Sequence, residues 1–195
     1  MNYFFSIINK NIKSKLSIPR FRYNEKTNKS YYLYSANIKD NKWYINKQKT
    51  KNNDNFYFLS SDQLDNETIF FLAKDNEIDK IINNNFSKLE NLNNFTDTNP
   101  DYRSNLQISL LNGGFSSYQS EYPHNMALKN GSILSPLSTL LNKDADQNFI
   151  FLRNIYFEPI NIKFNLYFID ISKKIILDKK TILKNKTNEI QIHKE

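Results

Sequence analysis

Glycine is nearly absent from this chain, and its three glycines all lie between residues 99 and 136. Three of the five prolines and one of the two histidines, His124, lie in the same stretch. Glycine adopts positive φ without a Cβ penalty, proline fixes φ and removes a backbone donor, and histidine titrates near neutral pH. We therefore expect special backbone geometry there, in either a long connection packed over a sheet or a binding or catalytic loop.

The scarcity of glycine and cysteine excludes several kinds of site. A phosphate-binding P-loop and a dinucleotide-binding fingerprint each need glycines at fixed spacings that this sequence lacks. The aromatic signature around a Lys-Gly-Phe core that marks RNA-recognition domains is also missing. Without cysteine there is no disulfide, thiolate metal site or cysteine nucleophile. We expect no cofactor.

The composition favours a β protein. A chain of 195 residues fits one domain or two small ones. Aromatic residues make up 14%, with 12 Tyr and 15 Phe, and such residues favour strands. We predict a single β-rich domain over residues 1–195, with a subdivision near Pro100 into 1–98 and 99–195 as the alternative.

Short apolar runs bounded by turn residues predict strands in the first half of the chain, at 3–8, 18–23, 30–39, 56–59 and 69–72. The turn residues at 40–42 predict a hairpin with the apolar run 43–45, and residues 47–55 read as a polar loop. Isoleucines and leucines at helical spacing predict a helix at about 77–92. Ser135-Pro136 predicts a second, short helix over 136–142.

The second half of the chain predicts antiparallel strands most clearly. Alternation at Leu106, Ile108 and Leu110 predicts a half-buried strand, followed by strands at 149–157, 163–171, 174–183 and 189–193. A phase slip between Phe168 and Ile169 predicts a β-bulge. The fold class that follows is mainly β: an antiparallel β-sandwich, of jelly-roll or immunoglobulin-like topology, with one or two short helices.

The net charge of +7 invites a nucleic-acid or membrane partner. Only four of the 27 cationic residues are arginine, the residue that phosphate recognition favours, and the lysines are scattered. The abundance of Asn, Lys and Ile is what a strongly AT-rich coding sequence would produce. We therefore do not expect nucleic acid as a partner. Residues 1–16 lack the order of a signal peptide and no run approaches a membrane span, so we expect a cytoplasmic protein without a membrane partner.

Candidate catalytic residues lie close together at Tyr118, Glu121, Tyr122 and His124. A Glu–His pair could act as a general base and its orienting group. The alternative is that Tyr122 packs the loop while Glu121 and His124 face water. The stretch 114–118 has no second glycine for a nucleophile elbow, so we do not expect acyl transfer through serine.

Asp144, Asp146 and Asn148 match three ligand positions of a calcium loop. Phe149 and Ile155 stand where that loop requires glycine and a bidentate glutamate, which excludes an EF-hand. Two interpretations of residues 144–148 stay open: a looser divalent-cation site, or a solvated turn before the strand that follows. Two histidines are too few for zinc, and we predict no metal site.

Arg153 shares strand parity with Phe149 and Phe151, which directs it toward an apolar face. A buried guanidinium needs an acceptor. Glu121 is the only carboxylate within 112–136 and is the preferred partner, although a backbone carbonyl could substitute for it. Other candidate partners are Asp144, Asp146 and Glu158. That segment lacks strand alternation, so we expect side chains rather than a sheet ladder to hold it. The alternatives are an internal structural bridge or a cation available to an anionic ligand.

Three functions remain open. The first is a non-catalytic β-sandwich binding or accessory protein, with a carbohydrate-like ligand or a protein partner. Its candidate ligand-binding residues are Arg103, Tyr118, Tyr122 and Arg153. The second is a small enzyme that acts on a carbohydrate-like or other small substrate through Glu121 and His124. The third is a basic protein that binds single-stranded nucleic acid on stacked aromatics.

Overall fold

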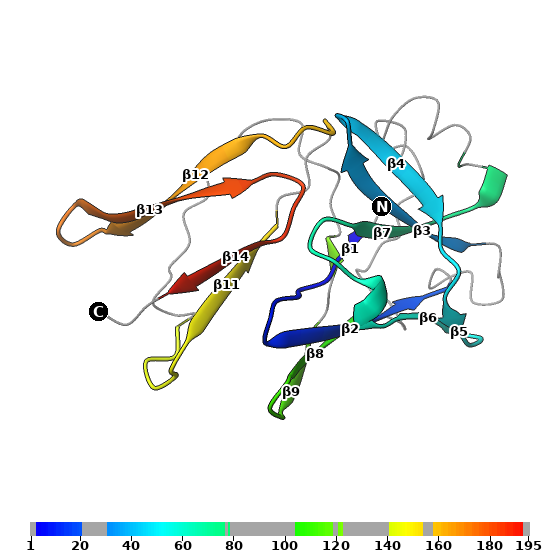
Figure 1. Ribbon diagram of the computed structural model, residues 1–195, viewed down its shortest axis with the longest axis horizontal. Coiled ribbons are helices and arrows are strands. Elements are labelled where there is room, and N and C mark those ends of the chain that lie inside the picture. Colours follow the sequence, from blue (N-terminus) through cyan, green and yellow to red (C-terminus); the bar gives the residue numbers. More distant parts are fainter. Residues whose placement is uncertain are drawn as a thin grey trace. The chain divides into compact units, whose positions relative to one another are not determined.

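The computed structural model describes residues 3–20, 31–76, 78, 104–118, 121–122, 141–153 and 158–192 (Figure 1). The chain divides into two compact units, Met1–Met126 and Ala127–Glu195. The strand that follows Pro100, Asn105–Leu110, pairs with one strand from before it, Ile12–Pro19, within the first unit. The prediction of one domain over 1–195 stays a prediction.

The first unit contains two five-stranded antiparallel sheets. One has the order β10-β1-β7-β3-β4, formed by Glu121–Tyr122, Tyr3–Phe4, Ile69–Ala73, Tyr32–Lys39 and Lys42–Lys47. Its β3–β4 hairpin confirms the predicted turn: Asp40 and Asn41 have φ of 50° and 58°. Two residues with positive φ make the type I′ turn that suits the twist of paired strands, and Asp and Asn tolerate this conformation.

The second sheet has the order β5-β6-β2-β8-β9, formed by Lys51–Asn52, Phe56–Leu59, Ile12–Pro19, Asn105–Leu110 and Phe115–Tyr118. Strand β2 is central, yet the sequence predicted strands at 3–8, before it, and at 18–23, which overlaps only its last two residues. A serine, Ser14, occupies one of its buried positions, and lysines, Lys13 and Lys15, occupy two of its exposed positions. The run therefore looks polar in the sequence. Strand β5 likewise lies inside the predicted polar loop 47–55.

Two of the three glycines form the β8–β9 turn. Gly113 and Gly114 have φ of 103° and 84°, a region that favours glycine. The expectation that no ladder holds the segment 112–136 is wrong at its start. Strand β9 pairs with β8, and β10 pairs with β1. These strands are too short to show alternation in the sequence.

Buried side chains from both sheets form one core cluster. The first sheet contributes Phe4, Leu33, Phe70 and Leu72, and the second contributes Leu16, Ile18, Tyr57, Leu59 and Leu106. All five residues of β7 are buried, as expected for a continuous apolar run without alternation. Fully burying an aliphatic or phenylalanine side chain contributes about 1.5–3 kcal/mol, so this cluster is the main source of the unit's stability.

The second unit contains two antiparallel pairs. Strand β11 (Asn148–Leu152) pairs with β14 (Asn188–Ile192), and β12 (Lys163–Asp170) pairs with β13 (Ile175–Leu183). All four predicted strands are thus present, and the register shift between Phe168 and Ile169 confirms the bulge. Phe168 faces Asp178 and Ile169 faces Ile176, so the extra residue is Leu177, on the partner strand.

The described elements are antiparallel strands and a 3-10 turn at Ser61–Gln63, which confirms a mainly β fold. The predicted helix at 77–92 lies outside the described residues apart from Ile78, which is helical, as are residues 75 and 76 just before the predicted start. Most of the predicted helix at 136–142 also lies outside the described residues, and the two described residues, 141 and 142, are not helical. Across the described ranges, no helix has the length and hydropathy needed to cross a membrane.

Candidate functional site

The backbone of the predicted catalytic group is divided between two sheets. Tyr118 ends β9 and pairs with Leu106. Glu121 and Tyr122 form β10, opposite Phe4 and Tyr3. The side chains of Tyr118, Glu121 and Tyr122, and all of His124 and Arg103, lie outside the described part of the chain. The catalytic hypothesis therefore stays a prediction.

Arg153 contacts the connection between β13 and β14. Its guanidinium donates to Thr187 Oγ1 at 2.9 Å and to the Asn185 carbonyl at 3.3 Å. Both acceptor residues are buried, and Asn185 Nδ2 donates in turn to the Glu158 carbonyl at 3.0 Å. These contacts support the internal structural role. A contact between Arg153 and Glu121 stays a prediction.

The calcium-like sequence 144–148 forms a closed turn before β11. Asn148 Oδ1 accepts from the Asn142 amide at 2.9 Å, and Asn148 Nδ2 donates to the Asn142 carbonyl at 2.9 Å. Asn142 Oδ1 accepts from the Asp144 amide at 3.0 Å. At one of the three calcium-like positions, Asn148, the side-chain oxygen thus accepts a hydrogen bond from the backbone. Among the described residues, no three His, Cys, Asp or Glu side chains are grouped to hold a metal ion.

The β5-β6-β2-β8-β9 sheet has a solvent side, which we call the basic face. The side chains of a strand alternate between its two faces, so residues that alternate with buried Leu16, Leu59 and Leu106 point away from the core. The strand register aligns these residues across the sheet. The basic face consists of Lys13, Lys15, Ser17, Lys51, Phe56, Phe58, Asn105, Gln107, Ser109, Phe115 and Ser117.

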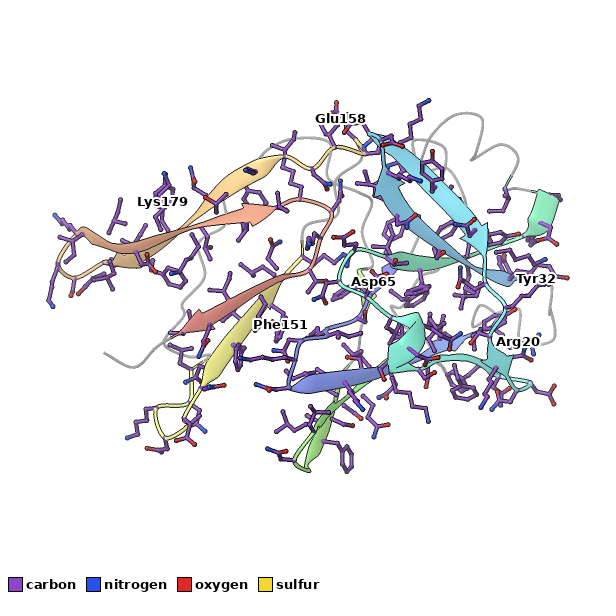
Figure 2. All side chains as sticks on the ribbon, in the orientation of Figure 1. Arg20, Tyr32, Asp65, Phe151, Glu158 and Lys179 are labelled. Carbon is purple, nitrogen blue, oxygen red and sulfur yellow. The ribbon has the colours of Figure 1, made fainter. Side chains whose placement is uncertain are left out.

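The charge of the basic face has one sign. Lys13, Lys15 and Lys51 are exposed, and the five described strands of this sheet contain no Asp or Glu. Arg20 follows β2 and lies beside the β5–β6 hairpin (Figure 2). It donates to the Asn53 carbonyl at 2.6 Å, and its guanidinium lies 5.1 Å from the centroid of the Tyr57 ring. Arg20 therefore fixes the edge of the sheet, while the lysines extend into solvent.

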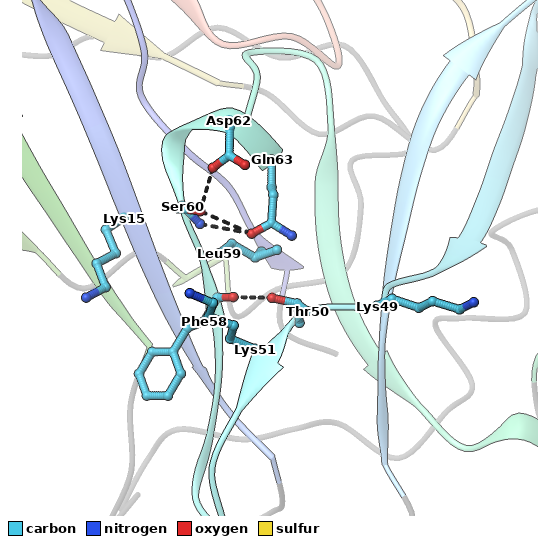
Figure 3. A pocket seen from close by; sticks show the side chains of 9 residues that line it. All are labelled: Lys15, Lys49, Thr50, Lys51, Phe58, Leu59, Ser60, Asp62 and Gln63. Carbon is cyan, nitrogen blue, oxygen red and sulfur yellow. Dashed lines mark hydrogen bonds between the residues drawn. The ribbon is translucent and has the colours of Figure 1, made fainter.

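An open pocket of about 960 Å³ adjoins the basic face (Figure 3). Its lining residues are Lys15, Lys49, Thr50, Lys51, Phe58, Leu59, Ser60, Asp62 and Gln63. Lys15 and Phe58 lie on one side, and the Lys49 side chain extends away from them. One of the pocket's lysines, Lys15, therefore lies on the same side as the Phe58 ring.

Asp62 is the carboxylate of this pocket. The Ser60 hydroxyl donates to Asp62 Oδ1 at 2.5 Å, and this bond is the main reason that the Asp62 pKa is lowered. A backbone hydrogen bond and the charge of Lys51 lower that pKa further. Asp62 is therefore ionised at neutral pH, and its carboxylate already accepts a hydrogen bond from Ser60 within the same turn.

The aromatic rings of the basic face come from strands on both sides of β2, the inner strand β6 and the edge strand β9. Phe56 and Phe58 lie on β6, with ring centroids 6.3 Å apart and planes at 38°. Phe115, on β9, is 74% exposed. Single exposed apolar residues are common on protein surfaces. Here, however, three rings share one face with three lysines, so the face can receive planar groups and negative charge together.

Comparison with known proteins found no match among family models, curated proteins or solved structures. The function must therefore be inferred from the chemistry of the surface.

The sequence contained one usable signal for the basic face. Lys13 and Lys15 alternate with Ile12, Ser14 and Leu16, the period of a strand with one solvent face. The general lysine content of the chain masked that signal. The pairing of β2 with β8, about ninety residues later, could not be predicted from local pattern.

Proposed function

We propose that this chain is a non-catalytic binding protein of β-sandwich type that binds an anionic ligand on its basic face. The sandwich assignment is supported by the single core cluster shared by the two five-stranded sheets of the first unit. Such an arrangement leaves the second side of the β5-β6-β2-β8-β9 sheet available to a ligand. The observation that carries the ligand assignment is the presence of Lys13, Lys15 and Lys51 in strands that contain no carboxylate.

The hydrogen-bonding capacity of the face favours an anion over a neutral carbohydrate. A lysine ammonium group offers three donors and no acceptor. It matches phosphate, sulfate or carboxylate oxygens, but it leaves the proton of a sugar hydroxyl without an acceptor. Asn105 and Gln107 offer carboxamide oxygens, yet no charged acceptor lies on the described strands of this sheet. The lysines therefore decide the ligand class.

Binding fits the pocket better than catalysis does. A general base works best when its pKa lies near the operating pH. The pKa of Asp62 is lowered instead, chiefly by its hydrogen bond from Ser60, which makes this carboxylate a weak base. The alternative enzyme, with Glu121 and His124 as base and orienting group, stays a prediction.

Affinity for immobilised heparin, a sulfated polymer, tests the proposal. The double variant Lys13→Glu/Lys15→Glu should elute at much lower salt than the wild type, because it reverses two charges on the face. The matched control is Lys39→Glu/Lys42→Glu on the β3–β4 hairpin, which changes the net charge equally but lies in the other sheet. Equal loss in both double variants would show that net charge alone determines retention, and would overturn the proposal.

A further inference from the structure

We infer that the ligand of the basic face is a single-stranded nucleic acid, with phosphates along the lysines and bases stacked on Phe58 and Phe115. This inference rests on the proposed function, because it names the ligand of the same face. Proteins that bind single strands without sequence preference combine a positively charged track with aromatic rings on which bases stack. The basic face contains both parts. The sequence argued against a nucleic-acid partner because its lysines are scattered along the chain, but the strand register gathers three of them on this one face.

The strand register places Lys15 between the two aromatic rings, Lys13 in the row of Phe115, and Lys51 beyond Phe58 on the edge strand β5. Phe58 pairs with Ser17, and Lys51 pairs with Phe58 from the other side. At the opposite corner Lys13 pairs with Ser109, which in turn pairs with Phe115. Lys15 lies on β2 between these two rows. A ligand that runs from Phe58 to Phe115 therefore passes over Lys15 and beside Lys13, and Lys51 lies at its Phe58 end.

The spacing of the rings requires an extended ligand. Phe58 and Phe115 are separated by three strand spacings, about 14 Å, and by four residues along the strands, about 13 Å. The diagonal is then about 19 Å, which exceeds the reach of a mononucleotide and fits a chain of several nucleotides. For scale, single-stranded binding sites on one OB-fold domain cover about 4–16 nucleotides.

The same surface favours a single strand over a duplex. In a duplex the faces of the bases are stacked on each other and cannot contact Phe58 or Phe115. In a single strand every base has a free face, and stacking is tolerant of sequence. The cations of the face are lysines, which bind phosphate as point charges without the forked geometry of arginine. We therefore expect little sequence preference.

Fluorescence anisotropy with a labelled thymidine oligomer of about 12 nucleotides tests this inference. Phe115→Ala and Phe58→Ala should each weaken binding by about 5- to 150-fold, as expected for the loss of one stacked base. Phe115 is the safer variant because its exposed side chain contributes little to folding. The control is Tyr44→Ala, another exposed aromatic, on β4 of the other sheet, and it should leave binding unchanged.

Salt dependence measures the phosphate contacts separately from stacking. Lys15→Ala should reduce the slope of log affinity against log salt by about 0.7. The phenylalanine variants should leave that slope unchanged while lowering affinity at every salt concentration.

Inorganic polyphosphate and a duplex of the same length distinguish a site for anions in general from a site for single-stranded nucleic acid. If polyphosphate and the oligomer bind equally well and the phenylalanine variants bind both like the wild type, the nucleic-acid inference fails and the anionic face stands. A duplex that binds as tightly as the single strand would also overturn this inference. If Lys13→Glu/Lys15→Glu changes neither heparin nor oligomer binding, both proposals fail together.

Discussion

The two compact units differ in where they place their large apolar side chains. In the first unit both sheets direct phenylalanine and leucine into a shared core. In the second, the β12–β13 hairpin exposes Ile171, Ile176 and Leu177 to 69%, 61% and 54%. Its described buried hydrophobic residues are Ile182 and Ile190. Apolar packing therefore stabilises the described strands of the first unit much more than those of the second.

Polar side chains take a larger part in the second unit. The carboxamide of Asn188 accepts from the Leu183 amide at 2.8 Å. It also donates to the carbonyls of Leu183, Lys186 and Leu152. One side chain thus links the end of β13, the start of β14 and the end of β11. Buried or half-buried polar groups are stable when their hydrogen bonds are made, and this connection meets that condition.

The largest expected effect is in the core of the first unit. Leu16→Ala should lower the free energy of unfolding by about 2–5 kcal/mol, because the side chain is fully buried and leaves a cavity. Ile176→Ala, in the exposed hairpin, should change it by no more than about 0.5 kcal/mol. Urea unfolding followed by far-ultraviolet circular dichroism reports on the strands of both units. Similar losses in the two variants would contradict the difference in packing.

Arg153 should give the next largest effect. Arg153→Ala should lower the free energy of unfolding by about 2 kcal/mol, since a charged donor is lost from Thr187 Oγ1 and the Asn185 carbonyl. Arg153→Lys should recover only part, because an ammonium group lacks the fork that reaches both acceptors. Faster amide hydrogen exchange at residues 184–188 would locate the loss. Unchanged exchange there would show that Arg153 does not hold this connection.

How far local pattern predicts this fold depends on how much of each strand is apolar. The runs 56–59 and 69–72 are visible as apolar segments and occur as strands β6 and β7. Strand β2 was missed because Lys13, Ser14 and Lys15 make it look polar. The bulge was predicted at the right place from one strand, but the extra residue, Leu177, lies on the other.

The partners of the candidate site residues were less predictable than the strands. Strand parity predicted that Arg153 needs an acceptor, but parity gives a direction and not a partner. Its acceptors, Asn185 and Thr187, lie more than thirty residues away and are brought close by the pairing of β11 with β14. The basic face depends on the same kind of long-range pairing, between β2 and β8.

A third test separates polar linkage from backbone pairing in the second unit. Asn188→Ala should lower the free energy of unfolding by about 1–2 kcal/mol, because the Leu183 amide and three carbonyls lose their partner. Asn188→Asp keeps the side-chain oxygen that accepts from the Leu183 amide and loses the Nδ2 donor. It therefore tests whether the accepted or the donated hydrogen bonds contribute more to stability. Asn165→Ala, at an exposed position of β12, is the control. Equal effects at Asn188 and Asn165 would show that the Asn188 network contributes nothing.

The smallest expected effect concerns exposed carboxylates, of which each unit has a comparable example. Asp75 in the first unit accepts from Lys47 Nζ at 2.7 Å, and Asp178 in the second accepts from Lys180 Nζ at 2.9 Å. Both pKa values are lowered, mainly by these lysine hydrogen bonds, with Tyr34 contributing next at Asp75 and the Lys179 amide at Asp178. Exposed ion pairs are weak and screened by salt.

The sign of their pH dependence follows from these lowered pKa values. A carboxylate whose pKa is lower in the folded state stabilises the fold above its unfolded pKa, and this contribution is lost as pH falls through the folded pKa. Asp75→Asn and Asp178→Asn should therefore each reduce stability slightly at pH 7, and the difference from the wild type should shrink below about pH 4. Urea midpoints measured from pH 7 to pH 3 provide the test. If one variant lost far more than the other, or if the difference grew in acid, surface charge rather than packing would separate the two units.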